Sequence, residues 1–237
     1  FDILSHHFSA SKVPAMLPFN PAAVVFSGIV RDEGARSFLK SLGVPVMEMW
    51  GEVADPIDML VMSQAREGGR LIGEHFGQQG FRRIAYIGHT SSRAQPRIQG
   101  FDAALKRYGS GISLLYPAEG TVEMQDGVEV VEKVLAKLPD CDAMMFGTDV
   151  MAAGALVKLQ QLGISIPAQI ALAGYGDLFF AAHTVPSMTS VHTSPYEVGR
   201  RTGDLLLERL STGKVVQRIL QVPLRLEIRD STRRNLR

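Results

Sequence analysis

Apolar residues recur at helical spacing along most of the chain and alternate with short runs that are almost entirely apolar. Four helical stripes are expected, at residues 35–42, 65–76, 98–108 and 124–138. Each precedes a short apolar run, at residues 44–49, 84–88, 112–116 or 143–146. Runs that are nearly all apolar are typical of strands buried on both faces of a parallel sheet. The repeated order of helix and strand therefore predicts an α/β fold with parallel sheets flanked by helices.

The last third of the chain predicts one more helix and a different kind of strand. The stretch Ser194-Pro-Tyr-Glu197 places proline at the first helical position between a capping serine and a glutamate, which predicts a capping box. This helix is expected to end near Gly213. Residues 219–228 then alternate in part, and Pro223 among them favours a strand at the edge of a sheet.

Composition excludes several classes of protein. The 237 residues have a net charge of +1, and because a DNA-binding surface normally carries a basic excess, we expect no strong DNA binding by these residues alone. No apolar run approaches the ~18 residues of a membrane span, so no membrane partner is expected. The single Cys141 excludes an internal disulfide or a cysteine metal cluster, and it suits a reducing compartment.

The sequence also lacks the motifs of several enzyme classes. It has no Gly-x-Gly-x-x-Gly after a strand, no Gly-x-x-x-x-Gly-Lys phosphate loop and no Gly-x-Ser-x-Gly turn. No two histidines stand at metal-ligand spacing with an acid. We therefore expect no enzyme, no cofactor and no metal, although doubly wound folds host many chemistries.

The segment from Phe146 to Asp177 is the most informative part of the chain. A strand ends at Phe146-Gly147, Thr148 and Asp149 open an Ala- and Leu-rich helix, and a second apolar strand ends in Gly174-Tyr-Gly-Asp177. Open α/β sheets bind ligands beyond the carboxyl ends of their strands, so both turns are expected to lie at a ligand site.

This segment resembles the effector-binding core of the lactose/galactose repressor family, which there reads Asn-Asp-x-Met-Ala-x-Gly-Ala, then Val-Pro, then Gly-Phe/Tyr-Asp-Asp. Thr148 and Gly176 depart from that pattern. Four further stretches resemble family motifs in the same order: Gly80-Phe-Arg-Arg-Ile-Ala-Tyr-Ile-Gly88, Arg97-Ile-Gln-Gly-Phe101, Pro186-Ser-Met-Thr-Ser-Val191 and Arg229-Asp-Ser-Thr232. Each motif is weak alone, but together they cover essentially the whole chain.

The resemblance implies a two-lobe, periplasmic-binding-protein-like fold with three crossings between the lobes. One lobe would comprise residues 1–62 and 192–216, and the other residues 63–191 and 217–237. It also implies a cytoplasmic transcriptional regulator, a repressor, that binds a small sugar or sugar acid in the cleft between the lobes. The protein would be a homodimer through residues 30–60 and 195–225, and operator DNA would be bound only through a helix-turn-helix domain that these residues do not include.

A sugar-binding protein of a transporter shares this fold and is the alternative. Such a protein would be secreted and monomeric, and it would lack the Arg-x-Ser-Thr ending. The stretch Arg229-Asp-Ser-Thr232, the helix start at Ser194-Pro-Tyr-Glu-Val-Gly199 and a first segment without signal-peptide character favour the regulator.

Two arginines and the Thr148 turn are the first candidate effector contacts. Arg97 follows the strand at 84–88, and a guanidinium there can grip a carboxylate or vicinal hydroxyls with paired hydrogen bonds. Arg93 stands four residues earlier, with a surface role as its alternative. Thr148 takes the effector-facing Asn position of the family or acts as a plain helix N-cap. Asp149, beside it, is better explained as a structural acid that caps backbone amides.

The remaining candidates come from other turns. Trp50 follows the strand at 44–49 and either stacks on a sugar or packs between the lobes. His6 follows the first visible strand and either reaches the cleft or lies in a surface loop. Asp177, at the second turn, and Thr193 complete the set with Gly176.

Two observations favour a sugar acid. The family carries an acid at the position of Gly176, and this chain lacks it. Such an acid ~4 Å from a ligand carboxylate would repel it by about 4 kcal/mol at an effective dielectric near ~20, which is roughly three decades in affinity. The substitution Gly176→Asp is then expected to weaken sugar-acid binding by about two to three decades. The stretch Val46-Met-Glu-Met-Trp50…Asp55-Pro-Ile-Asp-Met59 also resembles the subgroup that regulates gluconate utilisation, which reads Val-Val-Glu…Pro-x-Asp-Met there.

Overall fold

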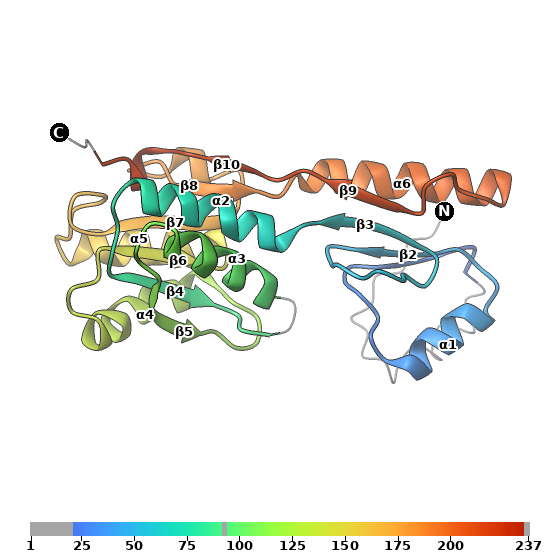
Figure 1. Ribbon diagram of the computed structural model, residues 1–237, viewed down its shortest axis with the longest axis horizontal. Helices are drawn as coiled ribbons and strands as arrows, with labels where there is room; N and C mark the ends of the chain where they lie inside the picture. The colour runs from blue at the N-terminus through green and yellow to red at the C-terminus, as the bar shows by residue number, and fades with distance from the viewer. Residues whose placement is uncertain (1–20, 92–93, 235–237) are drawn as a thin grey trace. The chain divides into compact units, whose positions relative to one another are not determined.

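The computed structural model describes residues 21–91 and 94–234, and the chain divides into two compact units (Figure 1). Unit 1 contains the described residues of Phe1–Gln64 together with Ser194–Val222, and unit 2 contains those of Ala65–Thr193 and Pro223–Arg237. The chain passes between the units three times. The third passage follows Val222 instead of the expected Val216, because residues 219–222 form a strand of the unit 1 sheet.

Unit 1 is a parallel sheet with one helix on each face. Its strands have the order β1-β2-β3-β9 and span Val24–Phe26, Val46–Met49, Met59–Ser63 and Ile219–Val222. Val46 packs in the cluster under helix α1, Glu33–Ser41, and the next residue Met47 packs in the cluster under helix α6, Pro195–Thr212. Because successive strand residues point to opposite faces, α1 and α6 cover opposite sides of the sheet, as Figure 1 shows.

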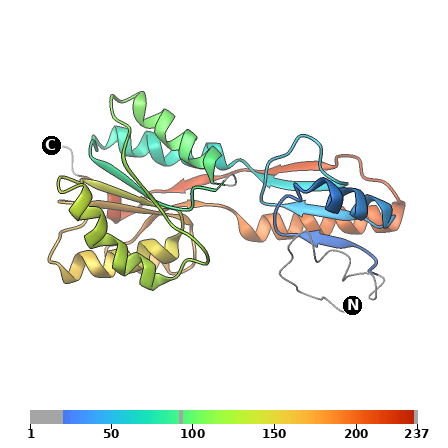
Figure 2. The same ribbon diagram turned by 90° about the horizontal axis from the view of Figure 1, so that it is seen from below.

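Unit 2 is a six-stranded sheet with a pair of helices on each face. The strands have the order β10-β8-β7-β6-β4-β5 and span Arg225–Glu227, Thr189–His192, Ala171–Gly176, Ala143–Phe146, Ile84–Gly88 and Ile112–Pro117. Helices α2, Ala65–Gln78, and α3, Gln95–Lys106, lie on one face; α4, Met124–Lys137, and α5, Asp149–Gln161, lie on the other (Figure 2). The predicted parallel sheet flanked by helices is confirmed, except that β10 runs antiparallel to β8.

Glycines bring the two helices of each pair into close contact. A Cβ atom on Gly69 of α2 would collide with the carbonyl group of Arg97 on α3, and one on Gly100 of α3 would collide with the backbone of α2. The backbones of α4 and α5 approach in the same way at Gly127 and Gly154. Gly100 and Gly154 belong to the motifs that carried the family resemblance, and their role in the fold is helix packing. Gly69 and Gly100 also fix the turn of α3 that carries Arg97.

The predicted edge strand at 219–228 is two strands. It breaks after Val222, and β9 pairs with β3 in unit 1 while β10 pairs with β8 in unit 2. Both strands do lie at sheet edges, as Pro223 indicated.

The predicted capping box at Ser194 is wrong. Ser194 has a left-handed backbone, with φ of 51°, and its side chain makes no capping hydrogen bond. Glu197 instead pairs with Arg200 at 2.8 Å and with Arg201 at 2.6 Å, because these arginines lie three and four residues further along the helix. The helix start is therefore defined by Pro195 and by the left-handed residue before it.

Residues 229–232 are bonded into the interior of unit 2. The Ser231 hydroxyl donates to the carbonyl oxygen of Leu172 at 2.6 Å and accepts from the Thr189 amide at 2.8 Å. The Thr232 hydroxyl lies 2.7 Å from the Thr189 hydroxyl and 2.7 Å from Nε2 of His75. The Arg-x-Ser-Thr ending therefore holds the sheet and helix α2 together.

The buried His75 predicts a pH-dependent stability. Burial lowers the pKa of His75 from 6.5 to about 4, and the positive charge of Arg233 adds to this effect. Between these two pH values the unfolded chain binds a proton that the folded chain does not, so stability is lost as the pH falls from 6.5 towards 4, by up to about 3 kcal/mol. Urea unfolding at pH 7, 6, 5 and 4.5 measures this loss. The variant His75→Gln, which cannot titrate, should lose less; equal losses in both proteins would contradict the assignment.

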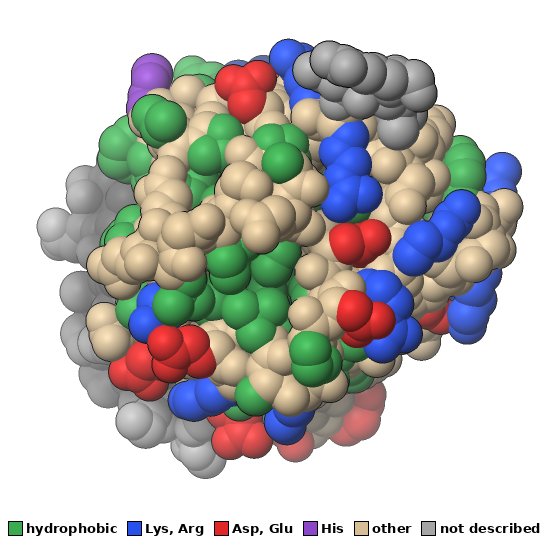
Figure 3. All heavy atoms as spheres, turned by 90° about the vertical axis from the view of Figure 1, so that its left-hand side faces the viewer, with side chains coloured by type: hydrophobic (Ala, Val, Ile, Leu, Met, Phe, Trp, Pro, Cys, Tyr) green, Lys and Arg blue, Asp and Glu red, His purple; other side chains and the backbone are tan. Residues whose placement is uncertain are grey.

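Two surfaces are rich in hydrophobic residues that are at least partly exposed. On unit 1 they lie along and just beyond α6 and are Tyr196, Leu207, Leu210 and Val216. On unit 2 a hollow of about 460 Å³ lies beside α5 and the 178–185 loop, with Val150, Ala153, Val157, Phe180 and Val185 among its lining residues. Figure 3 shows a face of unit 2 on which hydrophobic side chains collect between charged ones.

Candidate functional site

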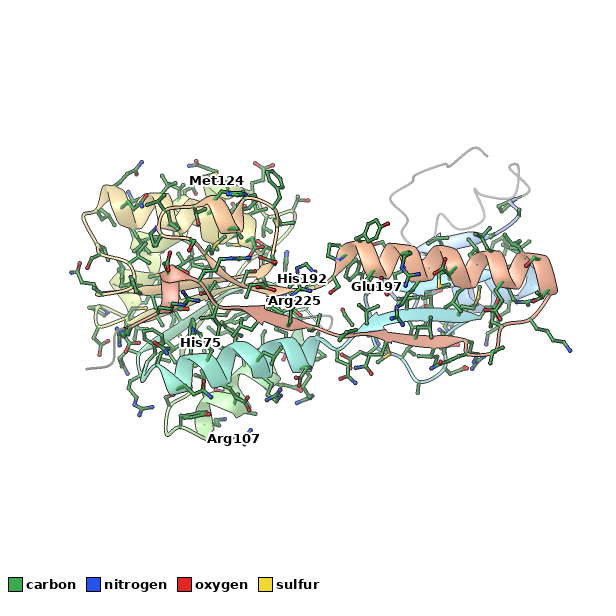
Figure 4. All side chains as sticks on the ribbon, turned by 90° about the horizontal axis from the view of Figure 1, so that it is seen from above. His75, Arg107, Met124, His192, Glu197 and Arg225 are labelled. Atoms are coloured by element: carbon green, nitrogen blue, oxygen red, sulfur yellow. The ribbon has the colours of Figure 1, made fainter. Side chains whose placement is uncertain are left out.

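Most of the candidate residues in unit 2 meet at one edge of its sheet. Strands β4, β6, β7 and β8 are parallel, so their carboxyl ends lie along the same edge. Helices α3 and α5 begin at this edge and bring Arg97 and Thr148 to it. Figure 4 labels His192, at the end of β8, together with its register partner Arg225 on β10. This edge is where an open α/β sheet places a ligand.

Arg97 is held in place by hydrogen bonds and a ring contact, and no acid of the described residues neutralises its charge. Its Nε donates to the Tyr86 hydroxyl at 3.0 Å, and its Nη1 donates to the Gly147 carbonyl oxygen at 3.1 Å. The guanidinium carbon lies 4.3 Å from the centre of the Tyr175 ring. The side chain is half-buried, and no carboxylate of the described residues forms a salt bridge with it. A positive charge in this state suits an anionic or hydroxyl-rich ligand.

Two glycines leave room for the guanidinium. A Cβ atom on Gly147 would lie 3.2 Å from Nη2 of Arg97 and 3.3 Å from the Cα atom of Gly88. Gly88 has a φ of 155°, which L side chains rarely adopt. The ends of β4 and β6 therefore approach each other closely beside Arg97, and larger residues would displace it.

Thr148 and Asp149 have roles in the fold. The Thr148 hydroxyl accepts from the Met151 amide at 3.3 Å, so Thr148 is the N-cap of α5. Asp149 is fully buried; its Oδ1 accepts from the Ser190 hydroxyl at 2.6 Å and its Oδ2 from the Leu178 amide at 2.7 Å. Burial raises the pKa of Asp149 above its usual range. These bonds favour the structural interpretation of Asp149, whereas Thr148 is half-buried and stays a predicted effector contact.

Asp177 is also engaged within the protein. It has a left-handed backbone, with φ of 53°, and follows β7 directly. Its Oδ1 lies 2.6 Å from Nη2 of Arg229, and its Oδ2 lies 2.8 Å from Nδ1 of His192. Because both carboxylate oxygens have partners, the geometry favours a role in fixing the turn after β7 over the predicted effector contact. Thr193 donates to the Gly176 carbonyl oxygen at 3.4 Å and is half-buried.

Gly176 has a backbone reason to be glycine. Its φ is 130°, and a Cβ atom there would lie 3.3 Å from Oδ2 of the buried Asp149. The substitution Gly176→Asp would therefore strain the backbone and place a carboxylate beside Asp149 whatever the ligand. The expected loss of two to three decades in sugar-acid affinity would therefore combine two effects, charge repulsion of the ligand and a change in the fold of the turn.

Trp50 lies at the end of β2 in unit 1 and packs within that unit. Its φ is 65°, and its amide donates to the Val61 carbonyl oxygen at 3.2 Å. The ring is half-buried against the hydrophobic cluster that contains Met47 and Val198. A left-handed backbone is unusual for so large a residue and indicates that the surrounding structure holds Trp50 in this position.

The stretch that suggested the gluconate subgroup consists in part of residues that hold unit 1 together. Glu48 is fully buried, and its two carboxylate oxygens accept from the amides of Val30 at 2.8 Å and Ile57 at 2.9 Å. Oδ2 of Asp58 lies 3.3 Å from Nε of Arg209 on α6. The glutamate and the aspartate of this motif are therefore explained by the fold and carry no information on the ligand.

Comparison with known proteins identifies the family. A family described as periplasmic binding protein-like domain matches residues 74–232. A LacI-family transcriptional regulator from Silicibacter pomeroyi superposes with a TM-score of 0.87 at 27% identity, covering 95% of this chain and 69% of that structure. The chain belongs to the LacI family. The resemblance inferred from the motifs is confirmed, and so is the periplasmic-binding-protein-like fold.

Two further LacI-type relatives bear on function. The regulator GntR from Pseudomonas aeruginosa is 32% identical over 221 residues, which are 91% of this chain and 64% of that protein. The chain thus spans a little under two thirds of this relative. The regulator CelR, solved as a complex with cellobiose, superposes with a TM-score of 0.79 at 26% identity, covering 93% of this chain and 69% of that one. These relatives are transcriptional regulators, in agreement with the expectation that the chain is not an enzyme.

Two predicted effector contacts of this LacI-family chain lie outside the described residues, and three further expectations concern a metal site, a membrane span and Cys141. His6 and Arg93 fall outside them. Within residues 21–91 and 94–234 no group of three histidine, cysteine or acidic side chains is placed to hold a metal ion. None of the helices described has both the length and the apolar character needed to cross a membrane. Cys141 is buried, and burial raises the pKa of its thiol to about 11.

The sequence did not single out three side chains at this edge. Tyr86 and Tyr175 contact Arg97, and His192 contacts Asp177. Both tyrosines lie within the motifs that resembled the LacI family, Tyr86 in the stretch from Gly80 to Gly88 and Tyr175 in Gly174-Tyr-Gly-Asp177. Their positions near strand ends were the available signal. Their contact with Arg97 depends on the pairing of β4, β6 and β7, which the motifs alone do not specify.

Proposed function

We propose that this chain is the effector-binding domain of a transcriptional regulator and that a small sugar or sugar acid binds at the carboxyl edge of the unit 2 sheet. The observation that carries the proposal is Arg97, whose guanidinium the fold orients through Tyr86 and Gly147 but does not neutralise with a carboxylate of the described residues. The relatives support the class of function, since they are transcriptional regulators and CelR was solved with cellobiose. Such a protein acts in the cytoplasm.

Charge at the edge favours a sugar acid such as gluconate over a neutral sugar. Two carboxylates near the carboxyl ends of the same strands, those of Asp149 and Asp177, already accept hydrogen bonds from the protein. They are therefore poorly placed to accept hydrogen bonds from sugar hydroxyl groups. A ligand carboxylate would supply the negative charge that Arg97 lacks and would accept paired hydrogen bonds from it.

A thermal-shift panel tests the ligand class. Gluconate or a keto-gluconate should raise the melting temperature more than glucose, galactose or a purine base. A ligand at one hundred times its Kd stabilises the bound form by about 2.7 kcal/mol, which corresponds to a shift of roughly 5–10 °C for a protein of this size. If a neutral sugar stabilises the protein and neither sugar acid does, the sugar-acid proposal fails while the regulator assignment stands.

Ligand binding would act on DNA binding by the whole regulator. The net charge of these residues is only +1, which favours a separate DNA-binding domain, as in the helix-turn-helix regulator GntR. A ligand shifts an equilibrium between two conformations only by its differential affinity for them. The test is to select genomic DNA fragments with the full-length protein and to titrate the selected fragment with and without gluconate. Equal DNA affinity under both conditions would contradict an effector role for gluconate.

The regulator should be a homodimer. The exposed hydrophobic residues along α6, such as Leu207, lie within the expected interface at 195–225, and the hollow beside α5 adds a second apolar surface. Exposed apolar surfaces of this kind are typical of protein interfaces.

Sedimentation equilibrium at tens of micromolar should give twice the 25.9 kDa mass of one chain. The variant Leu207→Asp, which places a charge among the exposed hydrophobic residues of α6, should shift the protein towards the monomer. Leu115→Asp is the matched control, because Leu115 is an exposed hydrophobic residue on β5 outside the expected interface. A parent protein that sediments as a monomer would contradict the assignment.

A further inference from the structure

Tyr86 joins the core of unit 2 to the guanidinium of Arg97. The residue lies on β4 and is fully buried, and its ring packs at a centroid distance of 6.2 Å from the ring of Phe101. Its hydroxyl group accepts the hydrogen bond from Nε of Arg97 at 3.0 Å. A buried ring has little rotational freedom, so the hydroxyl oxygen is a fixed point from which Arg97 takes its direction.

Tyr175 supports one face of the same guanidinium. It lies on β7, and the guanidinium carbon of Arg97 lies 4.3 Å from the centre of its ring, a distance typical of a cation–π contact. A Cβ atom on Gly68 of α2 would collide with the Tyr175 hydroxyl group, so the glycine at that position makes room for the ring. The ring therefore limits the movement of the guanidinium on that side.

These contacts decide how a ligand can approach Arg97. An arginine has five N–H groups, and Arg97 uses two of them, one towards Tyr86 and one towards Gly147. The Tyr175 ring lies against the guanidinium as well. The hydrogen-bonding groups left for a ligand are those of the two Nη atoms, and they lie in the plane of the guanidinium. A planar carboxylate forms paired bonds in that plane, whereas a single hydroxyl group forms one bond and gains less from a fixed plane.

We propose that Tyr86 and Tyr175 are positioning residues that hold the Arg97 guanidinium in the plane required by a ligand carboxylate, and thereby determine the preference for a sugar acid over its neutral counterpart. This inference rests on the proposed function of the same site. Because Arg97 is already ordered before the ligand binds, binding does not carry the entropic cost of ordering it. Losing this order should weaken affinity roughly tenfold.

The variant Tyr86→Phe isolates the hydroxyl group, because the ring stays in the core. By calorimetric titration, gluconate affinity should fall about tenfold and glucose affinity should change less than twofold. The lysine in Arg97→Lys has no Nε–H group that the Tyr86 hydroxyl could orient. Adding Tyr86→Phe to this variant should therefore cause no further loss of gluconate affinity. Tyr116→Phe removes a hydroxyl from β5 and is the matched control. Additive losses in the two backgrounds, or equal losses for gluconate and glucose, would overturn the proposal.

Tyr175 is tested by a pair of variants. Tyr175→Phe keeps the ring under the guanidinium and should retain gluconate affinity within twofold. Tyr175→Leu removes the ring and should lose about tenfold. If both variants lose affinity equally, the ring has no positioning role.

A ligand-free measurement separates this inference from the proposed function. The Nε–H resonance of Arg97, assigned by its loss in Arg97→Lys, should exchange with water at least about tenfold faster in Tyr86→Phe than in the parent or in Tyr116→Phe. If exchange accelerates but the parent binds no gluconate, the sugar-acid proposal fails and the positioning of Arg97 stands. If exchange is unchanged in Tyr86→Phe, Tyr86 does not position Arg97 and the inference fails.

Discussion

Replacing Arg97 with alanine should lower the affinity for the effector by roughly 30- to 5000-fold, about 2–5 kcal/mol, without unfolding the protein. The guanidinium is half-buried and has no carboxylate partner among the residues that the structure describes, so its removal leaves no orphaned acid there. The groups it releases are the Tyr86 hydroxyl and the Gly147 carbonyl oxygen, which are uncharged and lose one hydrogen bond each. The loss should therefore appear mainly in binding.

Calorimetric titration with the sugar acid that gives the largest thermal shift measures this loss. Arg107→Ala is the matched control, because Arg107 lies at the C-terminal end of the same helix and its side chain is exposed, with Glu74 as its partner at 2.9 Å. This variant should bind like the parent. If Arg97→Ala and Arg107→Ala bind equally well, Arg97 is a surface residue and the site lies elsewhere.

Replacing Arg229 with alanine should destabilise unit 2 by about 3 kcal/mol. The side chains of Arg229 and Asp177 are 19% and 11% exposed, and their pairing distance is 2.6 Å. Arg229 also donates to the carbonyl oxygen of Met188 at 2.7 Å. Without Arg229, the mostly buried carboxylate of Asp177 would keep only His192 of the two partners named above. The carbonyl oxygen of Met188 would lose its side-chain donor.

Urea unfolding at pH 7 measures this change. Arg225→Ala on β10 is the control, because the Arg225 side chain is 62% exposed and its partner Glu227 is its near neighbour on the same strand. That substitution should cost less than about 1 kcal/mol. Equal stability of the two variants would show that the Arg229–Asp177 pair adds nothing beyond a surface contact.

The sequence predicted the architecture because local patterns encode it. Apolar runs such as 84–88 and 143–146 have no polar position and can only be strands covered on both faces, and the stripes between them can only be helices. Two predictions failed, the capping box at Ser194 and the single strand at 219–228. Serine is a common N-cap, yet the chain turns with a left-handed residue at Ser194, and a continuous alternation hid the break after Val222.

The site was predicted in part, for a similar reason. The position of Arg97 after β4 follows from motif and strand order, whereas its contacts with Gly147 and Tyr175 join residues 50 and more positions apart. The same holds for Asp177, whose partner Arg229 stands 52 positions away. The structural role expected for Asp149 agrees with its bonds, but the sequence does not reveal which backbone amides and hydroxyl groups bind buried acids such as Glu48 and Asp149.

The late position of strands β9 and β10 has a consequence for synthesis of the protein. The ribosome delivers helices α1 to α6 and strands β1 to β8 before residues 219–232, which supply the last strand of each sheet and the partners of His75 and Thr189. A nascent chain that stalls before residue 219 therefore presents two sheets with open edges, one at β3 and one at β8. Neither unit reaches its native form until the final residues have emerged, so the chain depends on protection of these edges while it is being made.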